Sequence, residues 1–145
     1  MLEQRDVTAD KALCDAYLQT IYRVVGTAQP VDIRIGHCSA ALDELLKECG
    51  VREWAFVTAS NPRSRRLPDR DNARRNAEMK QSLQQAGWCA LEGMGVPCDG
   101  QWQPEASVLI LGIDRDAAMK LALRWEQNAF VRGEIGQPAE LLWVI

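Results

Sequence analysis

The feature that most constrains the fold is the run of residues 54–59, which is apolar except for Thr58. The run lacks the strict alternation of apolar and polar residues that a half-exposed strand shows. It therefore predicts a strand whose two faces are both covered by helices. Such a strand belongs at the centre of a sheet, in a chain whose helices and strands alternate.

Two helices are expected before this strand. Apolar residues at positions 13, 17, 21 and 24 predict an amphipathic helix over residues 8–24, with Thr8 as its N-cap. Ser39 is placed to cap a second helix, and Gly50 to end it in a left-handed conformation. Between the two helices, residues 31–35 alternate apolar with polar side chains, which predicts a strand towards the edge of the sheet.

Two more helices and four more strands are expected after the central strand. The helices cover residues 69–86 and a segment capped by Asp114, which turns Ala118, Leu121, Ala122 and Trp125 inward. The strands cover residues 88–91, 107–113, 129–132 and 140–145. The first two of these strands are expected to pair antiparallel, and the last two to form a hairpin around residues 133–138.

The order of elements predicts the topology. A strand–helix–strand crossover makes its two strands parallel, so the strands that begin near residues 31, 54 and 88 are expected to point the same way. Their C-terminal ends then share one edge of the sheet, to which the loop over residues 93–104 returns. The expected fold is α/β: one domain over residues 1–145, with a mixed sheet of five to six strands and four helices packed on it.

Charge and hydropathy argue against several classes of protein, although a local nucleic-acid patch is not excluded. The formal net charge of −3 argues against a surface built as a whole for nucleic acid, because phosphates are neutralised by clustered Lys and Arg. No apolar run approaches the roughly 18 residues of a membrane span, and the first residues lack the pattern of a signal peptide. We therefore expect a cytoplasmic protein with no membrane partner.

Metal and cofactor motifs are not found in the sequence. His37 is the only histidine, and the five cysteines contain no C-x-x-C pair, so no metal site and no disulfide framework is expected. We interpret the cysteines as small buried hydrophobes, with a reactive thiol at Cys38 or Cys98 as the alternative. Residues 95–100 have the glycine spacing of a P-loop, but Gln101 and Trp102 replace its Lys and its Ser or Thr. We expect no cofactor.

A basic loop follows the central strand. Residues 63–75 contain six arginines and two aspartates, which leaves a local charge of +4 in an acidic protein. Guanidinium groups beside the N-terminus of a helix suit phosphate or carboxylate. The alternative is a solvated basic surface that holds no ligand.

Two amides extend the apolar stripe of the helix that follows this loop. Asn72 and Asn76 lie on the same face as Met79 and Leu83, at helical spacing. A buried amide without hydrogen-bond partners costs about 1–3 kcal/mol, so both side chains are expected to bond either the turn at Asn61 or a ligand. The first alternative makes them structural braces.

The predicted topology brings these polar residues to one edge of the sheet. The candidate ligand-binding residues are Asn61, Arg63, Ser64, Asn72, Asn76, Trp102, Glu105, Gln127 and Asn128. His37 and Glu105 are the candidate catalytic residues, as an acid–base couple at that edge. The alternatives are a loop histidine and a surface carboxylate.

A resemblance to a known family accompanies these residues. The segments Thr58-Ala59-Ser60-Asn61-Pro62-Arg63-Ser64, Asn72 with Asn76, Trp102-Gln103-Pro104-Glu105-Ala106-Ser107 and Gln127-Asn128-Ala129 resemble domain-of-unknown-function family 3293 over about residues 17–132. The resemblance implies a small bacterial single-domain protein and transfers no activity or catalytic residue. The chain departs from the pattern at Glu126, where a glycine is expected.

Two classes of function remain. In the first, the shared edge binds a small anion such as a phosphate, a nucleotide or an RNA end, either as a binding protein or as an enzyme. In the second, the chain is an interaction or regulatory module whose arginine loop meets an acidic protein surface. The sequence does not decide whether the protein is an enzyme.

Overall fold

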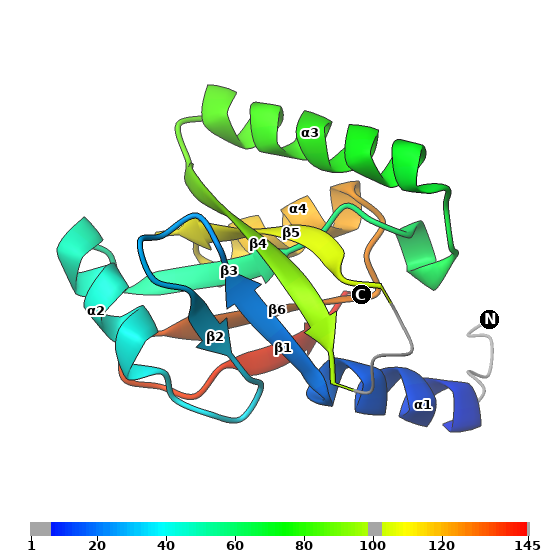
Figure 1. Ribbon diagram of the computed structural model, residues 1–145, viewed down its shortest axis with the longest axis horizontal. Helices are drawn as coiled ribbons and strands as arrows, with labels where there is room; N and C mark the ends of the chain where they lie inside the picture. The colour runs from blue at the N-terminus through cyan, green and yellow to red at the C-terminus, as the bar shows by residue number, and fades with distance from the viewer. Residues whose placement is uncertain (1–6, 99–102, 145) are drawn as a thin grey trace.

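The computed structural model describes residues 7–98 and 103–144, which form one α/β domain (Figure 1). Its sheet has seven strands, more than the five to six expected. They are β1 (Thr20–Val24), β2 (Val31–Ile33), β3 (Glu53–Val57), β4 (Cys89–Pro97), β5 (Glu105–Leu111), β6 (Ala129–Glu134) and β7 (Glu140–Trp143). The described helices are α1 (Val7–Leu18), α2 (Ala40–Cys49), α3 (Asp69–Gln85) and α4 (Arg115–Arg124), with a 3₁₀ turn, η1 (Pro62–Ser64).

The strand order is β2-β1-β4-β5-β3-β6-β7, and every pair of neighbours is antiparallel. The expected parallel pairing is therefore wrong, because β1 and β5 lie between the strands that the helices connect. β2, β4 and β3 still run in the same direction, since one antiparallel strand separates each from the next. The ends of β3 and β4 consequently lie at the same end of the sheet as the starts of β1, β5 and β6.

Two elements differ from their expected extent. The first helix stops at Leu18, and residues 20–24 form β1, in which Tyr22 and Val24 are buried by strand alternation. That helix begins at Val7, so Thr8 is not its N-cap. β4 extends through Pro97 and occupies the first part of the loop expected over residues 93–104.

The predicted caps of α2 and α4 are confirmed. Ser39 Oγ accepts a hydrogen bond from Leu42 N at 3.2 Å, and Gly50 ends α2 with φ 69°. Asp114 Oδ1 accepts one from Ala117 N at 2.8 Å. The predicted inward residues of α4 are all buried, and β6 and β7 form the predicted hairpin.

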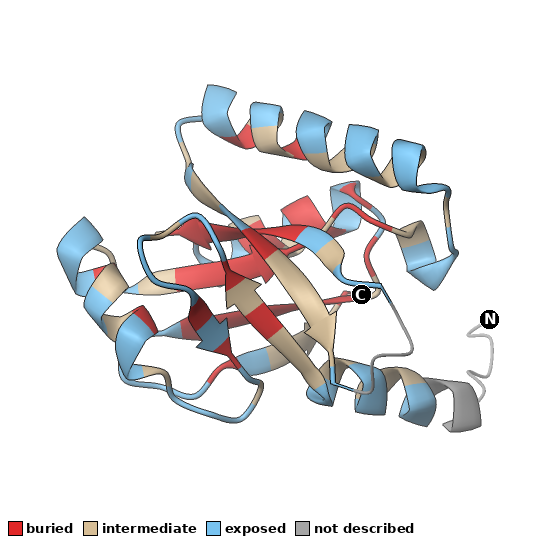
Figure 2. Cartoon of the chain, viewed as in Figure 1, coloured by how far each residue is buried: buried red, intermediate tan, exposed pale blue. Residues whose placement is uncertain are grey.

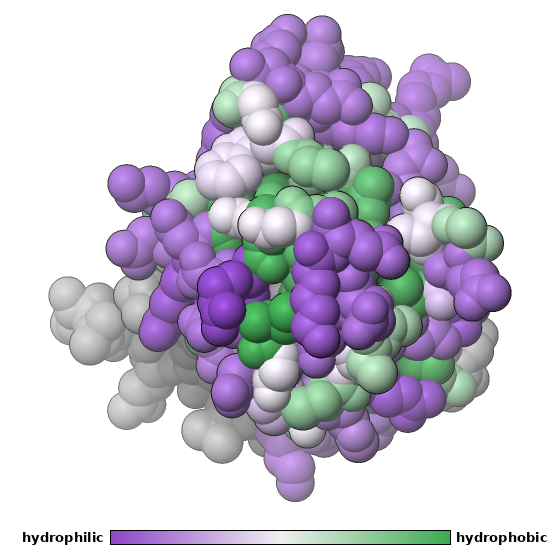
Figure 3. All heavy atoms as spheres, turned by 90° about the vertical axis from the view of Figure 1, so that its left-hand side faces the viewer, coloured by the Kyte–Doolittle hydropathy of each residue, from purple (hydrophilic) through white to green (hydrophobic). Residues whose placement is uncertain are grey.

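The core has two parts, one on each face of the curled sheet (Figure 2). Residues alternate between the faces along β3, so Ala55 and Val57 pack with α3 and α4, whereas Trp54 and Phe56 face the concave interior. α2 covers one end of that interior. From this end the surface is mostly polar, with apolar side chains visible in patches between polar ones (Figure 3).

Glycines on the concave face make room for the two rings of β3. A Cβ at Gly93 would lie 2.7 Å from Phe56 Cζ, and a Cβ at Gly133 would lie 2.7 Å from Trp54 Cζ2. Gly93 and Gly133 therefore let aromatic rings lie directly on the neighbouring backbone.

Candidate functional site

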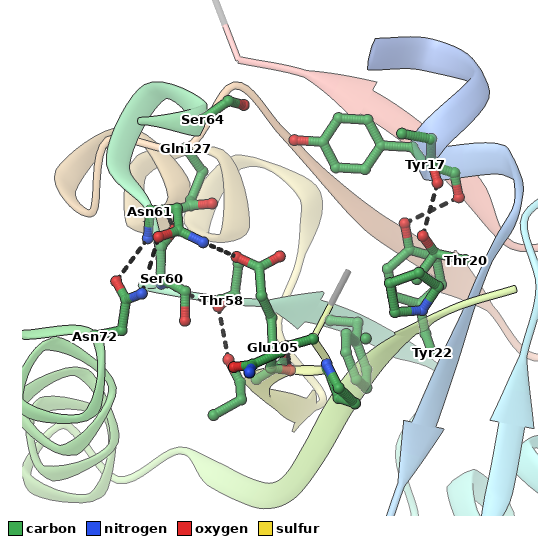
Figure 4. A pocket seen from close by; sticks show the side chains of 18 of the residues that line it. Tyr17, Thr20, Tyr22, Thr58, Ser60, Asn61, Ser64, Asn72, Glu105 and Gln127 are labelled. Atoms are coloured by element: carbon green, nitrogen blue, oxygen red, sulfur yellow. Dashed lines mark hydrogen bonds between the residues drawn. The ribbon is translucent and has the colours of Figure 1, made fainter. Parts of the chain in front are cut away.

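A pocket of about 510 Å³ opens at the end of the concave face that α2 does not cover (Figure 4). Strand alternation aims Glu105 of β5 and Thr20 of β1 into it from the sheet. Leu13 and Tyr17 of α1 form one wall, and residues of the loop after β3 form the opposite wall. This volume falls within the range of about 300–1,000 Å³ that small-molecule sites occupy.

Asn61 and Asn72 hold the loop wall in place. Asn61 Oδ1 accepts hydrogen bonds from Leu67 N at 2.9 Å and from Asn72 Nδ2 at 2.8 Å. Asn72 Oδ1 in turn accepts one from Asn61 N at 2.8 Å. The two amides thus bond the turn and each other, as the bracing alternative requires.

Asn76 and Gln127 support the preceding residues. Asn76 Oδ1 accepts from Ala59 N at 2.9 Å, and its Nδ2 donates to Ser60 Oγ at 2.8 Å. Gln127, which is 5 % exposed, donates from Nε2 to Ser60 O at 3.0 Å. Four amide side chains therefore fix the backbone on which the polar side of the pocket is built.

The loop is also held in an unusual backbone conformation. Asn61, Arg63 and Ser64 have φ of 48°, 52° and 60°, a left-handed region that non-glycine residues rarely adopt. Glu126, which stands where the family resemblance predicts a glycine, also lies in this left-handed region, with φ 59°. Arg63 N donates to Glu126 O at 2.6 Å, so two strained turns stabilise each other.

The arginines of the loop divide into two groups. Arg63 Nη1 donates to Gln127 O at 3.1 Å, and Arg75 donates to Ala59 O at 2.7 Å and to Trp125 O at 2.8 Å, so both bind backbone carbonyls. The other four are exposed, as Arg63 is, and bind no backbone carbonyl among the described residues; of the six arginines only Arg66 lines the pocket. Most of the local positive charge thus lies outside it.

The backbone donors of the loop are engaged as well. Ser64 N donates to Asn61 O at 2.9 Å, and Arg65 N donates to Pro62 O at 3.0 Å. The N–H groups of Asn61, Arg63 and Leu67 already bond the partners named above. The loop therefore does not present a row of open N–H groups to an anion.

Glu105 is the polar centre of the pocket. Its Oε1 accepts a hydrogen bond from Asn61 Nδ2 at 3.0 Å, which is the only hydrogen bond to this carboxylate among the described residues. No Lys or Arg in the described part of the chain forms an ion pair with it. Burial raises the pKa of Glu105, and the hydrogen bond from Asn61 opposes that shift.

Two tyrosines lie across the pocket from Asn61. Burial raises the pKa of Tyr17 to about 12; the charge of Glu105 adds to this shift and a hydrogen bond with Ser64 opposes it. Burial likewise raises the pKa of Tyr22, whose hydroxyl donates to Tyr17 O at 3.1 Å. Both phenols are neutral near pH 7 and supply hydrogen-bonding groups to an otherwise apolar wall.

Sequence reasoning missed both tyrosines as site residues. Tyr17 was assigned only to the apolar stripe of a helix, and Tyr22 was placed inside that helix. The alternation of apolar, charged and apolar residues at Tyr22, Arg23 and Val24 was a signal for a strand, but the helical spacing across residues 13–24 concealed it.

The remaining candidates lie elsewhere. His37 is at the opposite end of the sheet from Asn61, where His37 O accepts from Ala139 N at 3.1 Å, so it does not meet Glu105. The crossover argument placed it wrongly, because β2 is an edge strand whose following turn meets the start of β7.

Asn128 bonds Ser64 Oγ at 2.9 Å and, like Arg63, lies behind the pocket wall. Trp102 lies outside the described residues.

The cysteines are more exposed than expected. Cys38, Cys49, Cys89 and Cys98 are exposed and Cys14 is partly buried, so the interpretation as buried hydrophobes is wrong. Cys98 lines the mouth of the pocket.

Within residues 7–98 and 103–144, no group of three or more His, Cys, Asp or Glu side chains is arranged to hold a metal ion. No helix of that part of the chain is long and apolar enough to cross a membrane.

Comparison with known proteins identifies the family. The model of a family described as "Protein of unknown function (DUF3293)" matches residues 57–130, just over half of the chain, and the chain belongs to this family. No curated protein and no solved structure matches the chain. The matched segment contains Asn61, Asn72, Glu105 and Gln127, whereas α1 and β1, which carry the two tyrosines, lie before it.

Proposed function

We propose that this member of the DUF3293 family binds a small organic molecule in the pocket between α1, the start of β5 and the loop of residues 60–67. The observation that carries the proposal is the position of Glu105, a partly buried carboxylate that faces a cavity of about 510 Å³ with one hydrogen bond from the described residues. A cavity with an apolar lining and a few convergent polar groups is the usual form of a ligand site.

The rigidity of the loop supports a binding role. Left-handed residues at Asn61, Arg63 and Ser64 are retained at a cost of roughly 1–3 kcal/mol each, and such strain concentrates at ligand sites. The strained turn and its amide braces hold Asn61 against Glu105 before any ligand arrives. A preformed site loses less conformational entropy on binding.

The anionic group predicted from the sequence belongs, in this proposal, at the mouth of the pocket. Arg66 lines the mouth, and a phosphate or carboxylate of the ligand would face its guanidinium group. The apolar body of the ligand then lies against Tyr17, Tyr22 and Phe56. A nucleotide or a phosphorylated metabolite has this combination of parts.

Thermal unfolding with a panel of nucleotides, phosphorylated metabolites, amino acids and amines tests the proposal. We expect at least one compound to raise the melting temperature of the wild type, and Glu105→Gln to lose that shift. Arg66→Ala is expected to weaken only the anionic members of the panel. Arg70→Ala, an exposed arginine outside the pocket lining, is the matched control. Absence of stabilisation by every compound would refute a small-molecule site.

An acidic protein partner is the alternative to a small-molecule ligand. Arg65 and Arg70 are exposed and form no ion pair with the described residues, so they are free to meet acidic side chains. Under this alternative, a partner that co-purifies in fixed stoichiometry is lost on the double charge reversal Arg65→Glu with Arg70→Glu. Under the pocket proposal, the same variant keeps its ligand-induced stabilisation.

A further inference from the structure

We propose that the pocket binds a protonated amine, with Glu105 as its counter-ion. This inference rests on the proposed function and names the class of ligand that the site selects. It starts from Glu105, a partly buried carboxylate in the pocket lining, which also contains the exposed side chains of Arg66 and Asp69.

The carboxylate of Glu105 lacks a cationic partner among the described residues. Asn61 Nδ2 gives it one hydrogen bond from a neutral donor at 3.0 Å, whereas all the described ion pairs involve other carboxylates. A carboxylate removed from water needs an opposite charge or several donors to remain stable when ionised. An ammonium group on the ligand would supply both the charge and the missing donors.

The groups around Glu105 favour a cation over an anion beside this carboxylate. Tyr17, Tyr22 and Phe56 line the pocket beside Glu105, and aromatic rings attract cations. The six arginines of the loop do not compensate Glu105, since the only one that lines the pocket, Arg66, extends from the exposed part of the loop. Negative charge and aromatic rings together are the usual environment of a bound ammonium group.

The geometry also limits the shape of the amine. Asn61 occupies one side of the carboxylate, and its Oδ1 is already bonded to Leu67 N and Asn72 Nδ2. The ligand therefore approaches from the cavity side of Glu105, between the loop wall and the tyrosines (Figure 4). A primary amine on a short chain that carries an apolar or aromatic body fits this approach.

Phenethylamine and 2-phenylethanol are the probes for this inference, because they differ mainly in the charge of the terminal group. Dissociation constants are measured at neutral pH by NMR titration, with the side-chain amide signals of Asn61 and Gln127 as reporters of the pocket. We expect the wild type to bind the amine about tenfold more tightly, since a charge-assisted hydrogen bond exceeds a neutral one by roughly 1–1.5 kcal/mol.

Variants at Glu105 make the result specific. Glu105→Gln keeps an acceptor for Asn61 and is expected to lose the preference for the amine, and Glu105→Asp to keep part of it. Glu48→Gln, an exposed carboxylate on α2 at the far end of the molecule, is expected to keep all of it.

Three results would overturn the inference. They are an equal affinity for the two probes, a preference that survives in Glu105→Gln, and no shift of the two amide signals with the amine. If neutral or anionic members of the wider panel still bind the pocket, the amine inference fails and the proposed function stands. If no compound binds, both fail.

Discussion

Gly93 is expected to be a position on the concave face where an added methyl group is costly. In Gly93→Ala, the new Cβ would lie 2.7 Å from Phe56 Cζ, 2.8 Å from Phe56 Cε2 and 2.9 Å from Arg23 O. Carbon atoms in contact prefer about 3.5–4.0 Å, so the ring must move by most of an ångström. Tyr22 packs edge-on against that ring at 5.4 Å, and Arg23 O belongs to β1, so neither neighbour yields easily.

The expected loss of unfolding free energy is about 1–3 kcal/mol, the usual cost of overpacking a core. For a chain of this size it lowers the melting temperature by roughly 2–4 °C per kcal/mol. Gly95→Ala is the matched control, because it lies on the same strand and its nearest neighbour, Thr20 Cγ2, is 3.5 Å away. Replacing a strand glycine by alanine without a clash is neutral or stabilises by about 0.5–1 kcal/mol.

Urea unfolding of both variants, with Phe56→Leu as the partner in a double-mutant cycle, measures the effect. Leucine lacks the two ring atoms that the new Cβ meets, so Gly93→Ala should cost less in the Phe56→Leu background. The remaining contact with Arg23 O keeps the recovery partial. Equal stability of Gly93→Ala and Gly95→Ala, or strict additivity in the cycle, would refute the steric argument.

Three further predictions concern the pocket wall. Burial raises the folded-state pKa of Glu105, so the wild type loses stability as pH rises from the unfolded-state to the folded-state pKa of this carboxyl. The melting temperature of Glu105→Gln minus that of the wild type should therefore be larger at neutral than at acidic pH. A difference that does not change with pH would contradict this. Asn72→Ala removes bonds to Asn61 and should cost about 1–3 kcal/mol in urea unfolding, against almost nothing for the exposed Gln84→Ala. Both Glu126→Gly and Glu126→Ala lose the ion pair with Arg75 at 3.5 Å, but only glycine adopts the left-handed φ without strain. Glu126→Gly should therefore be about 1 kcal/mol more stable than Glu126→Ala in calorimetry, and equal stability would show that Glu126 is not strained.

Local signals in the sequence predicted the elements that depend on local physics. Ser39, Gly50 and Asp114 act through bonds to residues a few positions away, so their roles as caps can be predicted without knowledge of the fold. The antiparallel pairing of β4 with β5 followed from a direct connection between them. The pairing of β1 with β4 could not be predicted in this way, since the sequence of β1 also fits the end of a helix.

The candidate site was predicted in part for the same reason. Asn61, Glu105 and Gln127 were brought together by the directions of their strands, which the structure retains even though the strands are not neighbours. Arg63 and Asn128 do not line the pocket, since a sequence does not reveal which side of a turn a side chain leaves. The tyrosines were missed because the helix that carries Tyr17 packs on the sheet through contacts such as the edge-on pair with Trp143, far away in the sequence.

The position of β3 between β5 and β6 has a consequence for how the chain is made. Val57 pairs with Val108 and Phe56 with Val131, which are 51 and 75 residues later. At ribosomal rates of about 5–20 residues per second, β3 waits roughly 3–10 s for its first partner and 4–15 s for its second. During that interval, the most apolar strand of the protein has two unpaired edges, which is the state that molecular chaperones recognise. The strand that leads into the pocket loop is thus synthesised before four of the seven strands, both of its partners among them.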